Sequence, residues 1–278
     1  MIYNYNYRPL FYFLITFIAT CVLWFAGAYI SFQEDISHFY MLLMVPGLMA
    51  PFLISVVMIW TSKNSALKTE FVNRLINPRL IRLKILPVFF LIMPISVLVS
   101  IIISLSFGES ISQFRLSEGF SFSSGFIPVL LLLLLASTFE ELGWRGYAFD
   151  SLQSRYNYFT ASIVFSVLWS VWHFPLIFVK DSYQYEVFHQ NIWFGINFFV
   201  SIIPMGMIIS WICLKNKKSM IAAIVFHFII NMSQEMLEIT QATKCIQTVV
   251  LFAVVAVIVT MEKEMFFEKP CLFAEYQS

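Results

Sequence analysis

The stretch "LLLLLASTFEELGWRGYAFD" (residues 131–150) begins like the middle of a membrane helix and then places ionisable side chains where further apolar residues are expected. These are Glu140, Glu141 and Arg145. An ionisable group near the centre of a membrane helix costs about 2.5 to 3.5 kcal/mol on insertion scales, so each one needs a structural or functional reason. The stretch therefore bears on both the fold and the site.

The composition of the whole chain is that of a membrane protein. Hydrophobic residues make up 60% of it and charged residues 12%, and the mean hydropathy is +0.81. A helix needs about 20 apolar residues to cross a hydrocarbon core roughly 30 Å thick. The sequence predicts an all-α polytopic membrane protein, a single domain over residues 1–278 with a bundle of eight transmembrane helices. The expected spans are 9–30, 39–60, 85–107, 125–149, 158–179, 191–214, 219–237 and 245–261.

The basic residues predict how the bundle is oriented. Most of them, including all six in the loop at 61–84, fall on one side of the eight-helix arrangement, whereas Arg115, Lys180 and Lys244 fall on the other. Because cytoplasmic loops are enriched in lysine and arginine, we expect a multi-pass protein of the cell membrane with both termini cytoplasmic. The net charge of +1 argues against a nucleic-acid partner and leaves the lipid bilayer as the expected surroundings.

Helical spacing divides the charges of the opening stretch into two groups. Glu141 and Arg145 are four residues apart, so they lie on one helix face and are predicted to pair. Glu140 projects about 100° around the helix from Glu141, which leaves its carboxylate free to face something else. Gly143 and Gly146 follow, and such small residues permit close approach of neighbouring helices.

Two other predicted helices carry polar side chains in their interiors. Trp169 and His173 are four residues apart on the fifth, and His227 and Asn231 have the same spacing on the seventh. Taken singly, a buried ion pair is often a brace, and a membrane histidine or asparagine often only joins two helices. The set, spread over the fourth, fifth and seventh helices, predicts an active site there.

Hydrolysis of an amide bond would use these groups. It needs a base that activates water and donors that hold the oxyanion. Glu140 fits the base and His173 helps to orient the water, while His227 and Asn231 fit the oxyanion donors. This chemistry requires no cofactor.

Other interpretations use the same residues differently. His173, His227 and Glu140 are sufficient ligands for a catalytic Zn²⁺ with water in the open position, although no HExxH signature is present. A proton-coupled transporter would also bury acids and histidines, but repeat halves are not evident. A non-catalytic immunity or scaffold membrane protein would keep the fold without turnover.

Three short motifs resemble those of a known family. "EELGWR" (140–145) matches EExxxR, "WSVWH" (169–173) resembles FxxxH, and "HFIIN" (227–231) matches HxxxN. Together they resemble the CAAX-protease and bacteriocin-processing family of intramembrane proteases, in particular a microbial member of the type II, Ras-converting CAAX prenyl endopeptidases. The resemblance runs from Phe126 to Glu235, and the first three predicted helices contribute nothing to it.

The resemblance implies both a reaction and residue roles. The reaction is removal of the last three residues from a prenylated CAAX protein. The implied roles are Glu140 activating water with His173, His227 and Asn231 binding the oxyanion, and Glu141 and Arg145 supporting them. Trp169 departs from the phenylalanine of the motif. The prenyl chain is expected to lie in a groove lined by aromatic side chains, for which the candidates are Phe139, Phe165, Trp169 and Trp172.

Overall fold

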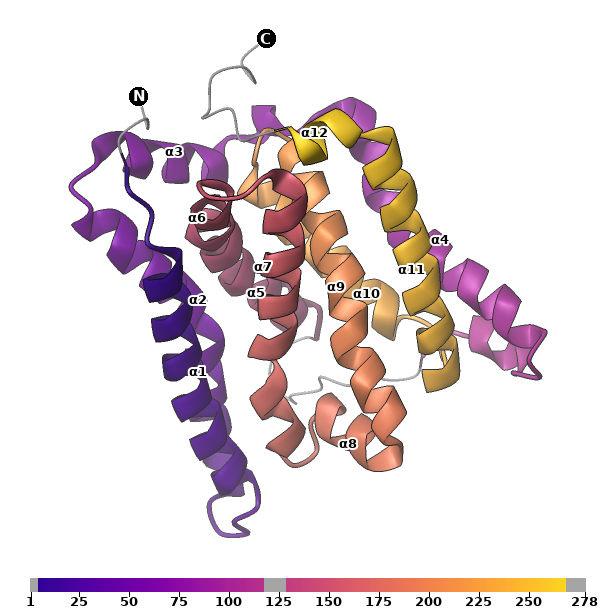
Figure 1. Ribbon diagram of the computed structural model, residues 1–278. Helices are drawn as coiled ribbons and strands as arrows, with labels where there is room; N and C mark the ends of the chain where they lie inside the picture. Colours follow the sequence, from indigo (N-terminus) through magenta and orange to yellow (C-terminus); the bar gives the residue numbers. More distant parts are fainter. Residues whose placement is uncertain (1–4, 118–128, 269–278) are drawn as a thin grey trace.

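A computed structural model describes residues 5–117 and 129–268 of the chain, and within these ranges the structure is helical apart from connecting turns and one isolated bridge (Figure 1). The first residues of the predicted span 125–149, including Phe126 where the resemblance begins, lie outside the described residues. The α-helices are α1 Pro9–Ser31, α2 Met41–Thr61, α3 Ser65–Ile76, α4 Leu86–Leu105, α5 Val129–Gly143, α6 Phe149–Gln153, α7 Tyr158–Trp172, α8 Tyr183–Gln190, α9 Ile192–Lys215, α10 Met220–Glu235, α11 Gln241–Met261 and α12 Lys263–Phe267.

Polar side chains fix where several helices begin. Asn64, Asn157, Asn191, Ser219 and Thr240 each accept a hydrogen bond from a backbone N–H two or three residues further on. These bonds satisfy donors that have no partner inside the first turn of a helix. The starts of α3, α7, α9, α10 and α11 thus follow from local capping.

Within residues 5–117 and 129–268, six helical segments are long and apolar enough to cross a membrane, and they match six of the eight expected spans. They are Pro9–Ser31, Ser37–Thr61, Leu83–Leu105, Tyr158–Phe178, Ile192–Lys215 and Gln241–Met261. The expected spans 125–149 and 219–237 instead correspond to short helices, α5 of 15 residues and α10 of 16. A 16-residue helix covers about 24 Å, less than the roughly 30 Å hydrocarbon core. Both short helices carry predicted site residues.

The helical path does not stop at the end of α5. It continues through a π-helical turn, η5 Trp144–Ala148, in which the N–H of Phe149 bonds to the carbonyl of Trp144, and then through α6. Single π-turns inside α-helices occur frequently at functional sites. This turn begins three residues after Glu141, and the sequence pattern did not predict it.

The two glycines of the opening stretch allow neighbouring segments to come close to this turn. A Cβ atom on Gly143 would lie 2.4 Å from the carbonyl carbon of Pro51 in α2. One on Gly146 would lie 2.6 Å from the ring of Phe71 in α3. The close approach expected at these glycines is confirmed, and its partners are α2 and α3.

The helices that carry the predicted site residues lie within the bundle. α5 packs against α2 and α10, α7 packs along α9, and α11 packs against α4 and α9. Figure 1 shows α3, α6 and α12 at one end of the bundle, together with both described ends of the chain, and α8 at the other end. The loop expected at 61–84 contains α3, whose Leu67, Phe71 and Arg74 are buried.

Candidate active site

A buried ion pair joins the two supporting residues of the opening stretch. Nη1 of Arg145 lies 3.0 Å from Oε2 of Glu141, and the two side chains are 1% and 0% exposed, so the predicted pairing is confirmed. The guanidinium also donates to Oγ of Ser210 in α9 at 3.2 Å and lies 4.4 Å from the ring centroid of Phe165. Arg145 therefore has Glu141 as its counterion and the ring of Phe165 as a cation–π partner, and both interactions offset the cost of burying its charge.

Glu141 has a second partner on another helix. Nδ1 of His227 in α10 lies 3.0 Å from its Oε1. One carboxylate thus bridges a guanidinium on its own helical segment and an imidazole on α10. This contact fixes α10 against α5 at the level of the predicted site.

Glu140 is placed differently from its neighbour. Its carboxylate is buried and accepts a 2.7 Å hydrogen bond at Oε2 from the indole Nε1 of Trp169 in α7. Among the residues that the structure describes, it forms no ion pair. The pattern expected from helical spacing, one paired acid and one acid facing elsewhere, is confirmed.

Trp169 brings the predicted base and both histidines together. Its ring centroid lies 5.2 Å from that of His227, edge to face, and 5.8 Å from that of His173. Glu140, His173 and His227 come from three different helical segments, yet all of them contact this one side chain. The sequence predicted Trp169 only as an aromatic lining residue. Its hydrogen bond to Glu140, which the phenylalanine of the motif cannot make, was not predicted.

The hydrogen bonds of the two histidines determine which nitrogen carries a proton. Nδ1 of His173 lies 2.8 Å from the carbonyl oxygen of Trp169, which can only accept, so Nδ1 is the donor and Nε2 of the neutral ring is an acceptor. Nδ1 of His227 donates to the Glu141 carboxylate in the same way. Nε2 of His227 is then a donor only when the ring is protonated. The two imidazoles are therefore suited to different roles.

Asn231 lies one turn beyond His227 on α10 and is half-buried. Its Nδ2 donates to Oγ of Ser137 at 3.3 Å, and that hydroxyl donates to the carbonyl of Leu133. An amide nitrogen carries two hydrogens, so one N–H remains for a ligand. Ser137 was missed by sequence reasoning, although its position four residues before Glu141 places it on the same helix face.

The four aromatic groove candidates occupy different environments. Phe139 is half-buried and lies 6.1 Å from the ring of Phe52 in α2. Phe165 and Trp172 belong to the packed core, at 0% and 1% exposure, and Trp172 donates to Oγ1 of Thr20 in α1. Trp169 is also buried, between Glu140 and the two histidines.

The zinc alternative requires His173, His227 and Glu140 to lie together as ligands. Across residues 5–117 and 129–268, no three His, Cys, Asp or Glu side chains are placed together as a metal site. His173, His227 and Glu140 contact Trp169 without forming such a set, and Oε2 of Glu140 is committed to the indole.

Comparison with known proteins identifies the family. Residues 122–233 match the family model described as type II CAAX prenyl endopeptidase Rce1-like. The chain is 64% identical over 269 residues to CAAX prenyl protease 2 from Methanococcus maripaludis, an alignment covering 97% of this chain and 99% of that protein. The chain belongs to the type II CAAX prenyl endopeptidase family. It is therefore a protease, and the non-catalytic interpretation loses its basis.

The part of the chain that matches the CAAX prenyl endopeptidase model coincides with the site. It includes the described segments α5, η5, α6, α7 and α9 and all of α10 up to Ser233. Every predicted catalytic and supporting residue lies inside it. Helix α3, which contacts η5 through Phe71 and Arg74, lies outside the matched residues.

Proposed function

We propose that this CAAX prenyl endopeptidase removes the C-terminal tripeptide from prenylated CAAX proteins, using a water molecule activated by Glu140. One observation supports this above the others. Glu140, His173 and His227 meet around Trp169, while the neighbouring Glu141 is occupied by Arg145 and His227. A carboxylate with one oxygen held by Trp169 and the other open, beside two imidazoles, supplies the base and the donors that amide hydrolysis needs.

In the proposed reaction, Glu140 takes a proton from water through Oε1, the oxygen that Trp169 leaves open. Nε2 of His173 accepts a hydrogen bond from the same water and orients it. The resulting hydroxide attacks the carbonyl carbon of the prenylated cysteine, and the C=O electrons move onto oxygen.

Oxyanion binding then falls to α10. Protonated His227 donates through Nε2, with its other N–H held by Glu141, and Asn231 donates through its remaining amide hydrogen. As the tetrahedral intermediate collapses, the C–N bond breaks and Glu140 returns its proton to the departing amine. The products are a tripeptide and a protein ending in the prenylated cysteine carboxylate.

The same proposal places the protein in the cell membrane with eight crossings and both termini cytoplasmic. The segment α5–η5, which lies within the expected span 125–149 and ends before Asp150, and the short α10 are the crossings that add to the six long segments. Two features support this orientation. Both described ends of the chain lie at the end of the bundle where α3 lies (Figure 1), and the α3–α4 connection exposes Arg79, Arg82 and Lys84.

The proposal is tested with purified protein and two synthetic peptides of one sequence ending in a CAAX motif, one farnesylated and one not. Mass spectrometry measures the released tripeptide. We expect release from the farnesylated peptide and little from the other, since a prenyl chain adds about 0.8 kcal/mol of favourable burial for each CH₂ group. Absence of cleavage with farnesyl and geranylgeranyl peptides alike, or equal cleavage without the lipid, would contradict the proposed substrate class.

A further inference from the structure

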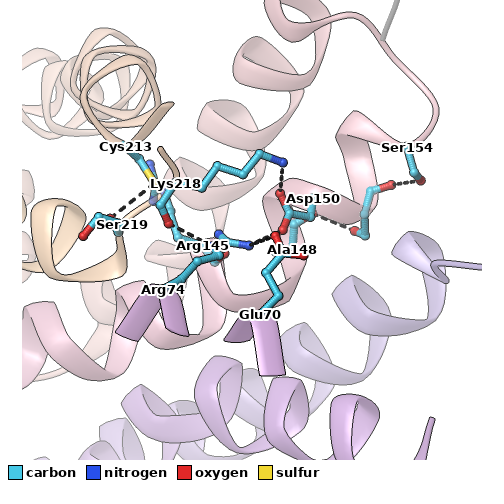
Figure 2. A network of polar contacts seen from close by, with 10 residues as sticks. Glu70, Arg74, Arg145, Ala148, Asp150, Ser154, Cys213, Lys218 and Ser219 are labelled. Carbon is cyan, nitrogen blue, oxygen red and sulfur yellow. Dashed lines mark hydrogen bonds and ion pairs between the residues drawn. The ribbon is translucent and has the colours of Figure 1, made fainter. Parts of the chain in front are cut away.

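Arg74 in α3 is a buried arginine whose hydrogen bonds reach three separate segments. Its Nη2 donates to the carbonyl of Arg145 in η5 at 2.5 Å, and its Nη1 donates to Oδ2 of Asp150 in α6 at 2.5 Å. Its Nε donates to the carbonyl of Lys218, in the turn between α9 and α10, at 2.8 Å. Figure 2 shows the guanidinium between these partners.

The first contact holds the π-turn that follows the helix carrying the proposed base Glu140 and the supporting Glu141. The carbonyl of Arg145 lies within η5, where the backbone leaves the regular α-helical register. Phe71, one turn before Arg74 on α3, packs on Gly146 of the same turn. Two side chains of α3 therefore hold η5, which continues the helix that carries Glu140 and Glu141.

The third contact, from Nε of Arg74 to the carbonyl of Lys218, holds the turn just before α10, the helix that carries the proposed oxyanion donors. Lys217 and Lys218 have φ angles of 53° and 61°, a region that non-glycine residues rarely adopt, so the surrounding structure must hold this turn. α10 begins directly after it, capped by Ser219. A shift of this turn would move His227 and Asn231 along the direction of α10.

The charges around the guanidinium are balanced. Asp150 pairs with Arg74 and, through Oδ1, with Nζ of Lys218 at 2.9 Å, and Glu70 lies 3.7 Å from Arg74. Burial alone would raise the pKa of Asp150, but the two cations outweigh it and hold the pKa below its ordinary value. The carboxylate stays ionised and orients the guanidinium toward the two backbone carbonyls.

We propose that Arg74 is a positioning residue for the hydrolysis, which sets the spacing between Glu140 on α5 and the His227–Asn231 face of α10. The inference rests on the proposed function. A planar guanidinium with several N–H groups in fixed directions can bind three acceptors at once, whereas an ammonium on a flexible stem cannot hold the same geometry. The role therefore depends on the shape of the side chain as well as on its charge.

The first test compares Arg74→Lys with the control Arg79→Lys, an exchange at an exposed position nearby. With folded protein and farnesylated CAAX peptide, we expect kcat of Arg74→Lys to fall about tenfold to a hundredfold with KM within about twofold, because small misplacements of reacting groups are that costly. Arg79→Lys should match the wild type. If Arg74→Lys keeps the wild-type kcat, the residue acts through charge alone and the proposal is overturned.

Hydrogen exchange gives a second readout that needs no activity. In Arg74→Lys, backbone amides in 144–150 and 216–223 should exchange faster than in the wild type, while those of α11 stay unchanged. Unchanged exchange in both segments would overturn the proposal. If wild-type protein cleaves no prenylated peptide, the proposed function fails, and this measurement still decides whether Arg74 fixes the two segments.

If Arg74→Lys does not fold, Asp150→Asn is used in its place as the test variant. It keeps an accepting oxygen and weakens only one of the three contacts of Arg74. We expect a smaller loss of kcat and faster exchange in 144–150. Wild-type values for both quantities would count against the proposal.

Discussion

The indole N–H of Trp169 donates a 2.7 Å hydrogen bond to the carboxylate of Glu140. The ring centroid of the same indole lies 5.2 Å from that of His227, in an edge-to-face arrangement. The bond holds one carboxylate oxygen and leaves the other to face a substrate water. A hydrogen bond to a charged group is worth about 1.5 to 3 kcal/mol, which is large enough to matter for a buried base.

Replacing Trp169 with phenylalanine, the residue of the family motif, should lower kcat on a farnesylated peptide. We expect a loss of about tenfold to a hundredfold with little change in KM, because the ring packing is largely kept and only the bond that orients Glu140 is lost. Steady-state kinetics checks this. The control is Trp24→Phe, which removes an indole bond to the carbonyl of Met44. Equal kcat values for Trp169→Phe and the wild type would refute the orienting role.

Glu141→Gln should act mainly on stability. It leaves Arg145, which is 1% exposed, without its counterion, and breaking a buried pair costs about 3 to 5 kcal/mol. We expect the thermal midpoint of the purified protein to fall by roughly ten degrees. Glu140→Gln, at the adjacent position, which forms no ion pair with the residues that the structure describes, should unfold near the wild-type temperature. A Glu141→Gln protein as stable as the wild type would mean that the pair contributes no net stability.

The Asp150 cluster predicts a loss of stability in acid. Because the pKa of Asp150 is lowered by Arg74 and Lys218 despite its burial, the stabilisation is complete above the ordinary carboxyl pKa of about 3.8 and is lost as the pH falls below it. The difference in thermal midpoint between the wild type and Asp150→Asn should therefore shrink as the pH is lowered through this range.

Burial and the nearby Asp150 raise the pKa of Glu70, so protonation of Glu70 in acid adds stability and opposes part of the loss caused by Asp150. Since Asp150→Asn also removes its effect on Glu70, the two proteins are compared in a Glu70→Gln background, in which Asp150 is the carboxyl group of this pair that titrates. A difference that stayed constant down to acid pH would show that Asp150 is not the titrating group.

Chelators should leave the activity unchanged. The proposed base works on water directly, and the described side chains are not arranged as a three-ligand metal site. The measurement is kcat on farnesylated peptide before and after dialysis against a strong chelator. Loss of activity that added Zn²⁺ restores would support the metal alternative built on His173, His227 and Glu140.

The sequence predicted the polar framework of the site because it depends on helical periodicity. The i, i+4 spacing gave the pairing of Glu141 with Arg145, and the one-residue offset placed Glu140 apart from that pair. Hydropathy likewise located the six long apolar helices that the described part of the chain contains. These features depend on neighbours within one helix, which a sequence displays directly.

Contacts between distant segments were not predictable in the same way. The local sequence pattern does not display the π-turn at η5, and the three partners of Arg74 lie more than 70 residues away along the chain. A partial signal was present, since Leu67, Phe71 and Arg74 recur at helical spacing and place the arginine on the buried face of α3. The prediction of a loop at 61–84 did not include this helix.

Glu140→Gln tests the central claim most directly. Glutamine keeps the size of the side chain and an oxygen that can accept from Trp169, but it cannot take a proton from water. If Glu140 is the base, the folded variant should release tripeptide from a farnesylated CAAX peptide at least a hundredfold more slowly than the wild type, since general bases contribute about 10² to 10⁴ in rate. Release at the wild-type rate would contradict the mechanism.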